Sequence, residues 1–114
     1  MEEMFEIAER AVGDQTSVLT VRGEIDVSTA PELRDRLLTV AQDGRAIVVV
    51  DLSAVTFLDS TALGVLVSGL KRLRADGGDL RLVVTGRSVA KVLEITGLVD
   101  VFSIFETVDA AVAG

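Results

Sequence analysis

The chain has 114 residues, about the length of one ordinary domain, and its 49% hydrophobic and 25% charged residues are typical of a folded globular protein. It contains no cysteine and no histidine, which excludes disulfides, zinc sites of the usual Cys/His kind and Ser-His-Asp or Cys-His catalysis. The formal net charge is −7 and no segment is rich in Lys or Arg, so nucleic-acid binding is not expected. We expect one domain that is not an enzyme and needs no metal or cofactor. The negative charge fits a basic protein partner better than a nucleic acid, although solubility alone also explains it.

The sequence also carries no signal for a membrane or an export pathway. Its longest apolar stretches, residues 46–50 and 63–67, are much shorter than the roughly 20 residues that cross a bilayer. Residues 1–4 are acidic, unlike a secretory signal or a mitochondrial transit peptide. We therefore expect a cytoplasmic protein with no membrane insertion.

The first part of the chain predicts two short strands and a helix. Residues 5–10 and 17–22 have strand composition, and Gly13-Asp14 between them favours a turn. Residues 29–32, Thr-Ala-Pro-Glu, combine a hydroxyl N-cap, an early proline and a Glu at the third helical position, which is a capping-box pattern. Apolar residues at helical spacing follow until Gly44, so a helix is expected there.

The second part predicts a buried strand followed by alternating helices and strands. Residues 46–52 form a largely β-branched apolar run, typical of a central strand buried on both faces. We expect a loop over 53–59, a helix from about residue 60 to Gly77-Gly78, strands at 80–85 and 101–105, and helices at 88–96 and 107–113. This order predicts an α/β fold with a mixed, mostly parallel sheet of four to five strands and about four helices.

The segment after the central strand is the strongest candidate for a functional site. In α/β folds, functional groups gather in loops beyond the carboxyl ends of parallel strands, and Ser60 lies at the start of the helix that follows. Unpaired N–H groups and the helix dipole favour an anion there, so a phosphoserine would be tolerated. However, Asp59, Ser60 and Thr61 are all good N-cap residues, and capping alone stays open as their role.

Two motifs carry a family resemblance. Residues 51–52 read Asp-Leu and residues 57–64 read Phe-Leu-Asp-Ser-Thr-Ala-Leu-Gly, while residues 23–26, before the first helix, read Gly-Glu-Ile-Asp. With the element order over residues 5–113, these motifs resemble the STAS family, and in particular its anti-sigma-factor antagonist branch. Thr61 and Ala62 stand where the family commonly has Ser and Gly, which is within its variation. The resemblance implies a single STAS domain over residues 1–114, with the STAS fold.

The resemblance also implies a partner switch. Such antagonists bind an anti-sigma factor with serine kinase activity and so release a sigma factor. The kinase then uses ATP to phosphorylate the antagonist, at Ser60 in this chain, which lowers its affinity, and a phosphatase acting on phosphorylated Ser60 resets the cycle. Asp26, Asp59 and Thr61 are the other expected partner contacts. For Asp59 the alternatives are capping or orienting the Ser60 hydroxyl, and for Asp26 the alternative is an Asx-turn.

Other functions fit the sequence less well. Asp51, near the end of the central strand, resembles the phospho-acceptor of a receiver domain, but that chemistry needs a lysine directly after a late strand, and neither Lys71 nor Lys91 is so placed. A hydrolase lacks its Gly-x-Ser-x-Gly elbow and its histidine, and nucleotide binding lacks a P-loop. Within the fold, a non-phosphorylated STAS subunit of a stressosome or lipid-transport complex remains the alternative, although the intact Asp59-Ser60 pair favours the phosphorylated branch.

Overall fold

Five strands form one sheet in the order β1-β2-β3-β4-β5 in the computed structural model, which describes residues 5–114. The acidic residues 1–4, considered above as a possible targeting signal, lie outside the described part. The strands are β1 (Glu6–Val12), β2 (Thr16–Ile25), β3 (Ile47–Leu58), β4 (Asp79–Val83) and β5 (Ser103–Phe105). β1 pairs antiparallel with β2, and all other neighbours are parallel. The expected α/β class, with a mixed and mostly parallel sheet, is confirmed.

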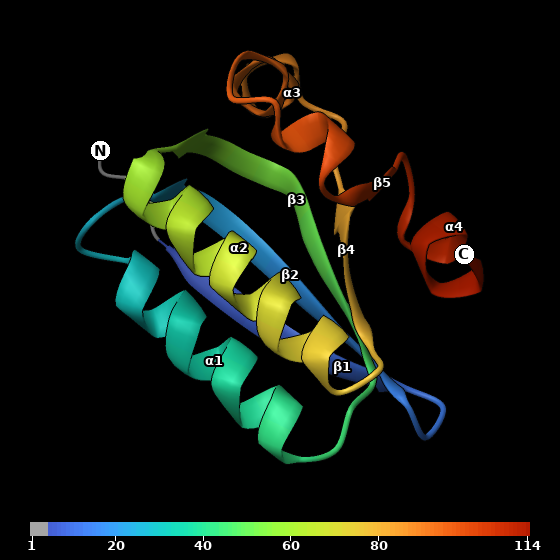
Figure 1. Cartoon of the computed structure of the whole chain (residues 1–114). Coiled ribbons are helices and arrows are strands. Elements are labelled where there is room, and N and C mark those ends of the chain that lie inside the picture. The colour runs from blue at the N-terminus through green and yellow to red at the C-terminus, as the bar shows by residue number, and fades with distance from the viewer. Residues whose placement is uncertain (1–4) are drawn as a thin grey trace.

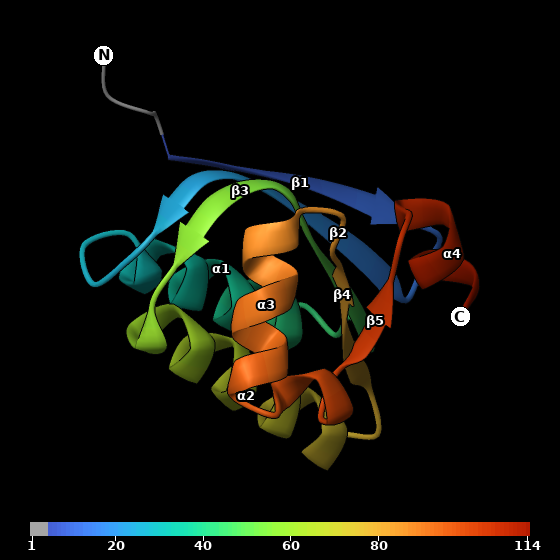
Figure 2. The ribbon, with the colours of Figure 1, turned by 90° about the horizontal axis from the view of Figure 1, so that it is seen from above.

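Helices cover both faces of this sheet. They are α1 (Ala30–Gln42), α2 (Ser60–Ala75), α3 (Arg87–Ile95) and α4 (Val108–Ala113), with a short 3-10 helix η1 (Leu98–Asp100) before β5. Figures 1 and 2 show α1 and α2 side by side on one face of the sheet, and α4 beside β5. Within residues 5–114, no helix combines the length and the apolar character that a bilayer span requires.

The central strand β3 supplies both layers of the core. Val48 and Val50 point into the large cluster beneath α1, α2 and α3, whereas Val49 packs into a smaller cluster with Ala111 of α4. All three valines are fully buried, which confirms the expectation from the β-branched run. The sheet is therefore fixed from both sides at the strand that leads to Ser60.

Strand β3 is longer than the sequence predicted. The expected loop over residues 53–59 is wrong, because β3 continues to Leu58 and pairs with the equally extended end of β2, where Ile25 lies opposite Leu58. Two register shifts in β2–β3 absorb the irregular residues of this region. The last strand, in contrast, is shorter than expected, because η1 takes up residues 98–100 and Val101 closes it.

The helix α1 begins where expected, but not by the expected contacts. Thr29 is its N-cap residue, yet its side chain accepts no hydrogen bond from the helix, so the predicted capping box is wrong. The hydroxyl instead donates to the carbonyl of Glu24 and accepts from the N–H of Asp26, both at 2.9 Å. Thr29 therefore ties the β2–α1 loop to the end of β2.

Candidate functional site

The ends of β2 and β3 bring the two motifs together. The strands are parallel neighbours, and Ile25 pairs with Leu58, so the residues that follow them, Asp26 and Asp59, lie at the same carboxyl edge of the sheet. The Asp59 N–H also donates to the carbonyl of Ile25 at 3.2 Å. The sequence expectation that Asp26 and Ser60 share this edge is therefore met by the geometry.

Ser60 is the first residue of α2 and its side chain is exposed. The N-cap is Asp59, whose Oδ1 accepts from the backbone N–H of Ala62 at 3.0 Å. The Ser60 hydroxyl makes no hydrogen bond to any of residues 5–114, and the first turn of α2 contains no acidic residue. Asp59 thus does the capping, while the hydroxyls of Ser60 and Thr61 are left accessible from solvent.

Asp26 organises the loop between β2 and α1. Its Oδ1 accepts from the Ser28 hydroxyl at 2.6 Å, from the Ser28 N–H at 2.9 Å and from the Thr29 N–H at 3.2 Å. These bonds form an Asx-turn, the alternative that the sequence had left open. The bonds from Ser28, first from its hydroxyl and then from its N–H, hold the pKa of the Asp26 carboxyl below its ordinary value. The carboxylate is therefore charged at neutral pH and fixed in place.

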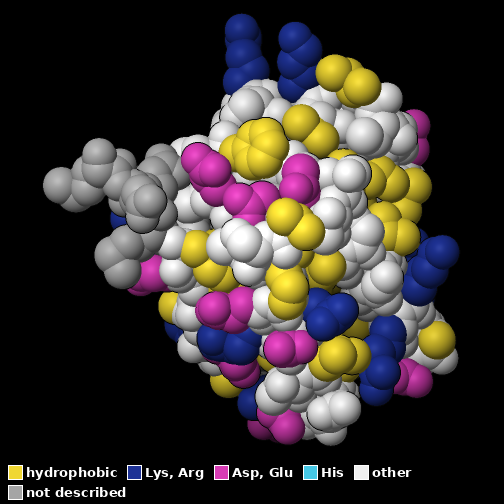
Figure 3. Space-filling model, turned by 90° about the vertical axis from the view of Figure 1, so that its left-hand side faces the viewer, with side chains coloured by type: hydrophobic (Ala, Val, Ile, Leu, Met, Phe, Trp, Pro, Cys, Tyr) yellow, Lys and Arg dark blue, Asp and Glu magenta, His cyan; other side chains and the backbone are white. Residues whose placement is uncertain are grey.

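Two large apolar side chains are exposed beside these acids. Val27 follows Asp26 in the loop and is 69% exposed, and Phe57 lies near the end of β3 and is 50% exposed. Figure 3 faces this end of the molecule and shows acidic side chains grouped beside hydrophobic ones. We call the following group the Ser60 surface: Asp26, Val27, Phe57, Asp59, Ser60 and Thr61. Its mixture of acidic, apolar and hydroxyl groups is suited to contact with another protein.

Sequence reasoning missed the two apolar members of this surface. Phe57 belongs to the motif, but strand alternation would place it on the same face as the buried Val55. Its exposure follows from the register shifts between β2 and β3, which interrupt the alternation and which the sequence does not reveal. No pattern in the sequence distinguishes Val27, because its exposure follows from the turn that Asp26 forms.

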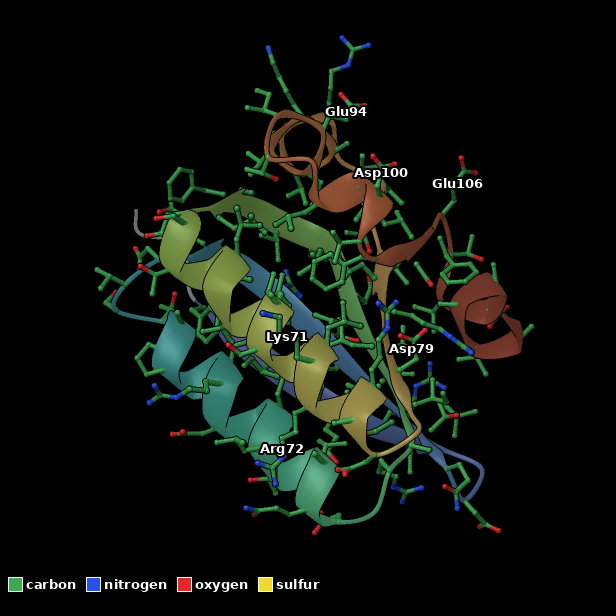
Figure 4. All side chains as sticks on the ribbon, viewed as in Figure 1. Lys71, Arg72, Asp79, Glu94, Asp100 and Glu106 are labelled. Atoms are coloured by element: carbon green, nitrogen blue, oxygen red, sulfur yellow. The ribbon has the colours of Figure 1, made fainter. Side chains whose placement is uncertain are left out.

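The receiver-domain alternative is contradicted by the position of Asp51. This residue lies within β3, paired with Thr20 and Val83, and its Oδ1 accepts from the N–H of Ser53 at 3.0 Å and from the Ser53 hydroxyl. β3 continues beyond Asp51 as far as Leu58, so the strand does not end at this residue, as it would at the phospho-acceptor of a receiver domain. Lys71 belongs to α2 (Figure 4), and Lys91 to α3. Among residues 5–114, no group of three or more acidic side chains is placed to hold a metal ion.

Known proteins are similar to this chain in sequence and in fold. The family model described as "STAS domain" matches residues 8–111. An anti-sigma-B factor antagonist of Staphylococcus aureus is 36% identical over 98 residues, and the match covers 86% of this chain and 91% of the relative. The Bacillus subtilis protein of the same name is 38% identical over 86 residues, and the match covers 75% of this chain and 78% of the relative. The crystal structure of an anti-sigma factor antagonist from Mycobacterium paratuberculosis superimposes with a TM-score of 0.88 at 32% identity, covering 96% of this chain and 92% of the other. The chain therefore belongs to the STAS domain family.

Proposed function

We propose that this protein is an anti-sigma-factor antagonist whose binding is switched off by phosphorylation of Ser60. Its partner in this proposal is an anti-sigma factor with serine kinase activity, and binding releases a sigma factor. The names of the relatives from S. aureus and B. subtilis support the antagonist role. The observation that carries the switch is an exposed Ser60 hydroxyl, free of hydrogen bonds to residues 5–114, at the capped start of α2.

In the unphosphorylated state, the Ser60 surface is the binding face. Val27 and Phe57 supply apolar area, and an exposed aromatic ring is a frequent source of binding energy at protein interfaces. Asp26 and Asp59 border this area with negative charge and favour a basic partner surface. The neutral hydroxyls of Ser60 and Thr61 can be buried there at little cost.

Phosphorylation acts on the interface and leaves the fold intact. A phosphate on Ser60 adds about −1.5 to −2 charge at pH 7, directly beside Asp59. The N-terminal N–H groups and dipole of α2 compensate part of this charge within the domain. The partner surface, which is built to accept a neutral hydroxyl, gives no such compensation, so affinity falls. The same exposure admits a phosphatase that acts on phosphorylated Ser60 and restores binding.

In this scheme the protein acts by binding and not by catalysis. Because the kinase that phosphorylates it needs ATP, we propose that the protein acts in the cytoplasm. A non-phosphorylated STAS subunit of a stressosome or lipid-transport complex would have no use for the accessible Ser60 hydroxyl. No observation on the described residues favours that alternative.

The test is phosphorylation by the cognate kinase, which can be isolated by its binding to the wild-type chain and identified by mass spectrometry. With radiolabelled ATP, the wild type and Thr61→Ala should be labelled, and Ser60→Ala should not. Thr61→Ala is the matched control, because it removes the neighbouring exposed hydroxyl of the same helical turn. Labelling of Ser60→Ala to the wild-type extent would contradict the assignment of the site. A partner that is a membrane transport protein with no kinase activity would contradict the function.

A further inference from the structure

Large apolar side chains are also exposed outside the Ser60 surface. Within residues 5–114, five large hydrophobic side chains are exposed, and the three that do not belong to the Ser60 surface come from α3, η1 and the residue after it. Ile95 is 74% exposed, and Val99 and Val101 are each 41% exposed. The three side chains lie within seven residues of sequence, and the core does not require any of them.

Of these three side chains, Val99 lines a groove of about 260 Å³ between α3, η1 and β5. The apolar part of its lining includes Val84, Leu93, Val99 and Ile104. Its lining residues come from α3, η1, β5 and the residues next to β4 and β5, and none of them belongs to the Ser60 surface. The groove therefore shares no residue with the binding face already described.

Unpaired carboxylates stand at the groove. Glu94 of α3 and Glu106 after β5 line it, and Asp100 of η1 lies close by (Figure 4). None of the three makes an ion pair or a side-chain hydrogen bond with any of residues 5–114. Because the three acids have no intramolecular partners, the groove has a negative electrostatic potential, which favours a cationic ligand.

Basic side chains of the domain do not neutralise this site. Arg74 reaches the neighbourhood, but its guanidinium is bonded to Asp79 at 3.1 Å and to the carbonyl of Val101 at 3.3 Å. Arg87 and Lys91 are exposed on α3 and do not line the groove. The three carboxylates therefore have no bonded cation among residues 5–114 and are available to a basic partner.

We propose that this groove is a second docking site, which binds a segment of a protein partner that carries Lys or Arg residues alternating with apolar ones. The apolar side chains fill the groove over Leu93 and Ile104, and the cations meet Glu94, Asp100 and Glu106. Such a site would let the domain hold one partner at the groove while another occupies the Ser60 surface. The proposal does not depend on phosphorylation of Ser60 or on the identity of the partner there.

The probe for the test is a fluorescein-labelled twelve-residue peptide of alternating Lys and Leu, and the comparison peptide has Glu in place of Lys. Fluorescence polarisation with the full chain at low salt should give saturable binding of the Lys peptide and none of the Glu peptide. With ¹⁵N-labelled protein, the largest amide shift changes should fall in residues 94–106. Changes centred on residues 26 and 59–61 instead would overturn the proposal, because they would mean general attraction to an acidic surface.

A pair of charge-matched variants separates the groove from net charge. Glu94→Gln with Glu106→Gln should weaken the Lys peptide at least about threefold, since each exposed ion pair contributes a modest amount. The control, Asp14→Asn with Asp43→Asn, removes the same total charge at exposed positions outside the groove and should leave affinity unchanged. Val99→Ser should weaken binding without changing charge. Equal affinity of all variants for the Lys peptide, or no saturable binding of that peptide below about 1 mM, would overturn the proposal. Dimerisation of the chain through α3 that excludes the peptide would overturn it as well.

Discussion

The N-cap of α2 gives a direct way to separate the structural role of Asp59 from its role in binding. Asp59→Ala removes the 3.0 Å hydrogen bond from the N–H of Ala62, and with it the negative charge nearest the start of the helix, whose first turn has no acidic residue of its own. Loss of a good N-cap costs about 0.5 to 2 kcal/mol, and the lost dipole interaction is part of that cost. For a 114-residue chain, a loss of 1 to 2 kcal/mol corresponds to a fall in Tm of about 4 to 8 °C.

Asp59→Asn is the informative companion, because Asn caps a helix about as well as Asp but carries no charge. We expect it to lose less than about 1 kcal/mol of stability by thermal unfolding followed with circular dichroism. Asp43→Ala is the control, since Asp43 is exposed at the end of α1 and its side chain makes no hydrogen bond with residues 5–114. A Tm for Asp59→Ala within 1 °C of the control would refute the capping argument. If Asp59→Asn then binds the anti-sigma factor at least tenfold more weakly than wild type, the carboxylate contacts the partner; wild-type affinity would remove Asp59 from the proposed interface.

Three further predictions concern the switch, the packing and the response to acid. Ser60→Asp should keep its circular dichroism spectrum and unfold within a few degrees of wild type, yet bind the partner at least about tenfold more weakly. The reason is that one like-charge pair about 6 Å apart, at an effective dielectric near 20, costs roughly 3 kcal/mol. Wild-type affinity of this variant would refute the electrostatic switch. Gly78→Ala should be strongly destabilised in urea titration, by about 2 kcal/mol or more, because its Cβ would lie 2.0 Å from the carbonyl oxygen of Ala46, and a loss below 0.5 kcal/mol would contradict this packing. The Asp26 carboxylate, with its lowered pKa, stabilises the fold above pH about 4 and loses this contribution as the pH falls through its folded pKa. In Asp26→Asn, the free energy of unfolding should therefore fall less steeply below pH about 4 than in wild type. Identical acid profiles of the two proteins would rule the contribution out.

Local patterns in the sequence predicted most of the fold, because they report residues whose environment is set by their own neighbours. The apolar run at residues 46–52 identified the central strand, since consecutive valines are typical of a strand buried on both faces. Residues 53–58 show no such pattern. They are extended because β2 is long enough to pair with them, which is a tertiary effect, and the sequence therefore predicted a loop there.

The candidate site was predictable to a similar degree. The start of α2 and the proximity of Asp26 to Asp59 followed from the motifs and from the parallel order of β2 and β3. The capping pattern did not predict the contacts of the Thr29 hydroxyl, because it does not reveal that this hydroxyl donates to the Glu24 carbonyl and accepts from the Asp26 N–H. The exposure of Val27 depends on the turn that Asp26 forms, and the sequence pattern therefore did not predict it.

The hydrogen bond from the Asp59 N–H to the carbonyl of Ile25 has a consequence for protein engineering. It joins the last residue of one strand to the first residue after the next, and the hydroxyl of Thr29 fixes the adjoining loop to the same strand end. The two motifs are thus parts of one rigid piece of backbone, although more than thirty positions separate them in the sequence. An engineered scaffold that displays the Ser60 surface must therefore carry the ends of both β2 and β3 in register. Transplanting only the Asp-Ser-Thr start of α2 would transfer its hydroxyls without the apolar side chains of Val27 and Phe57.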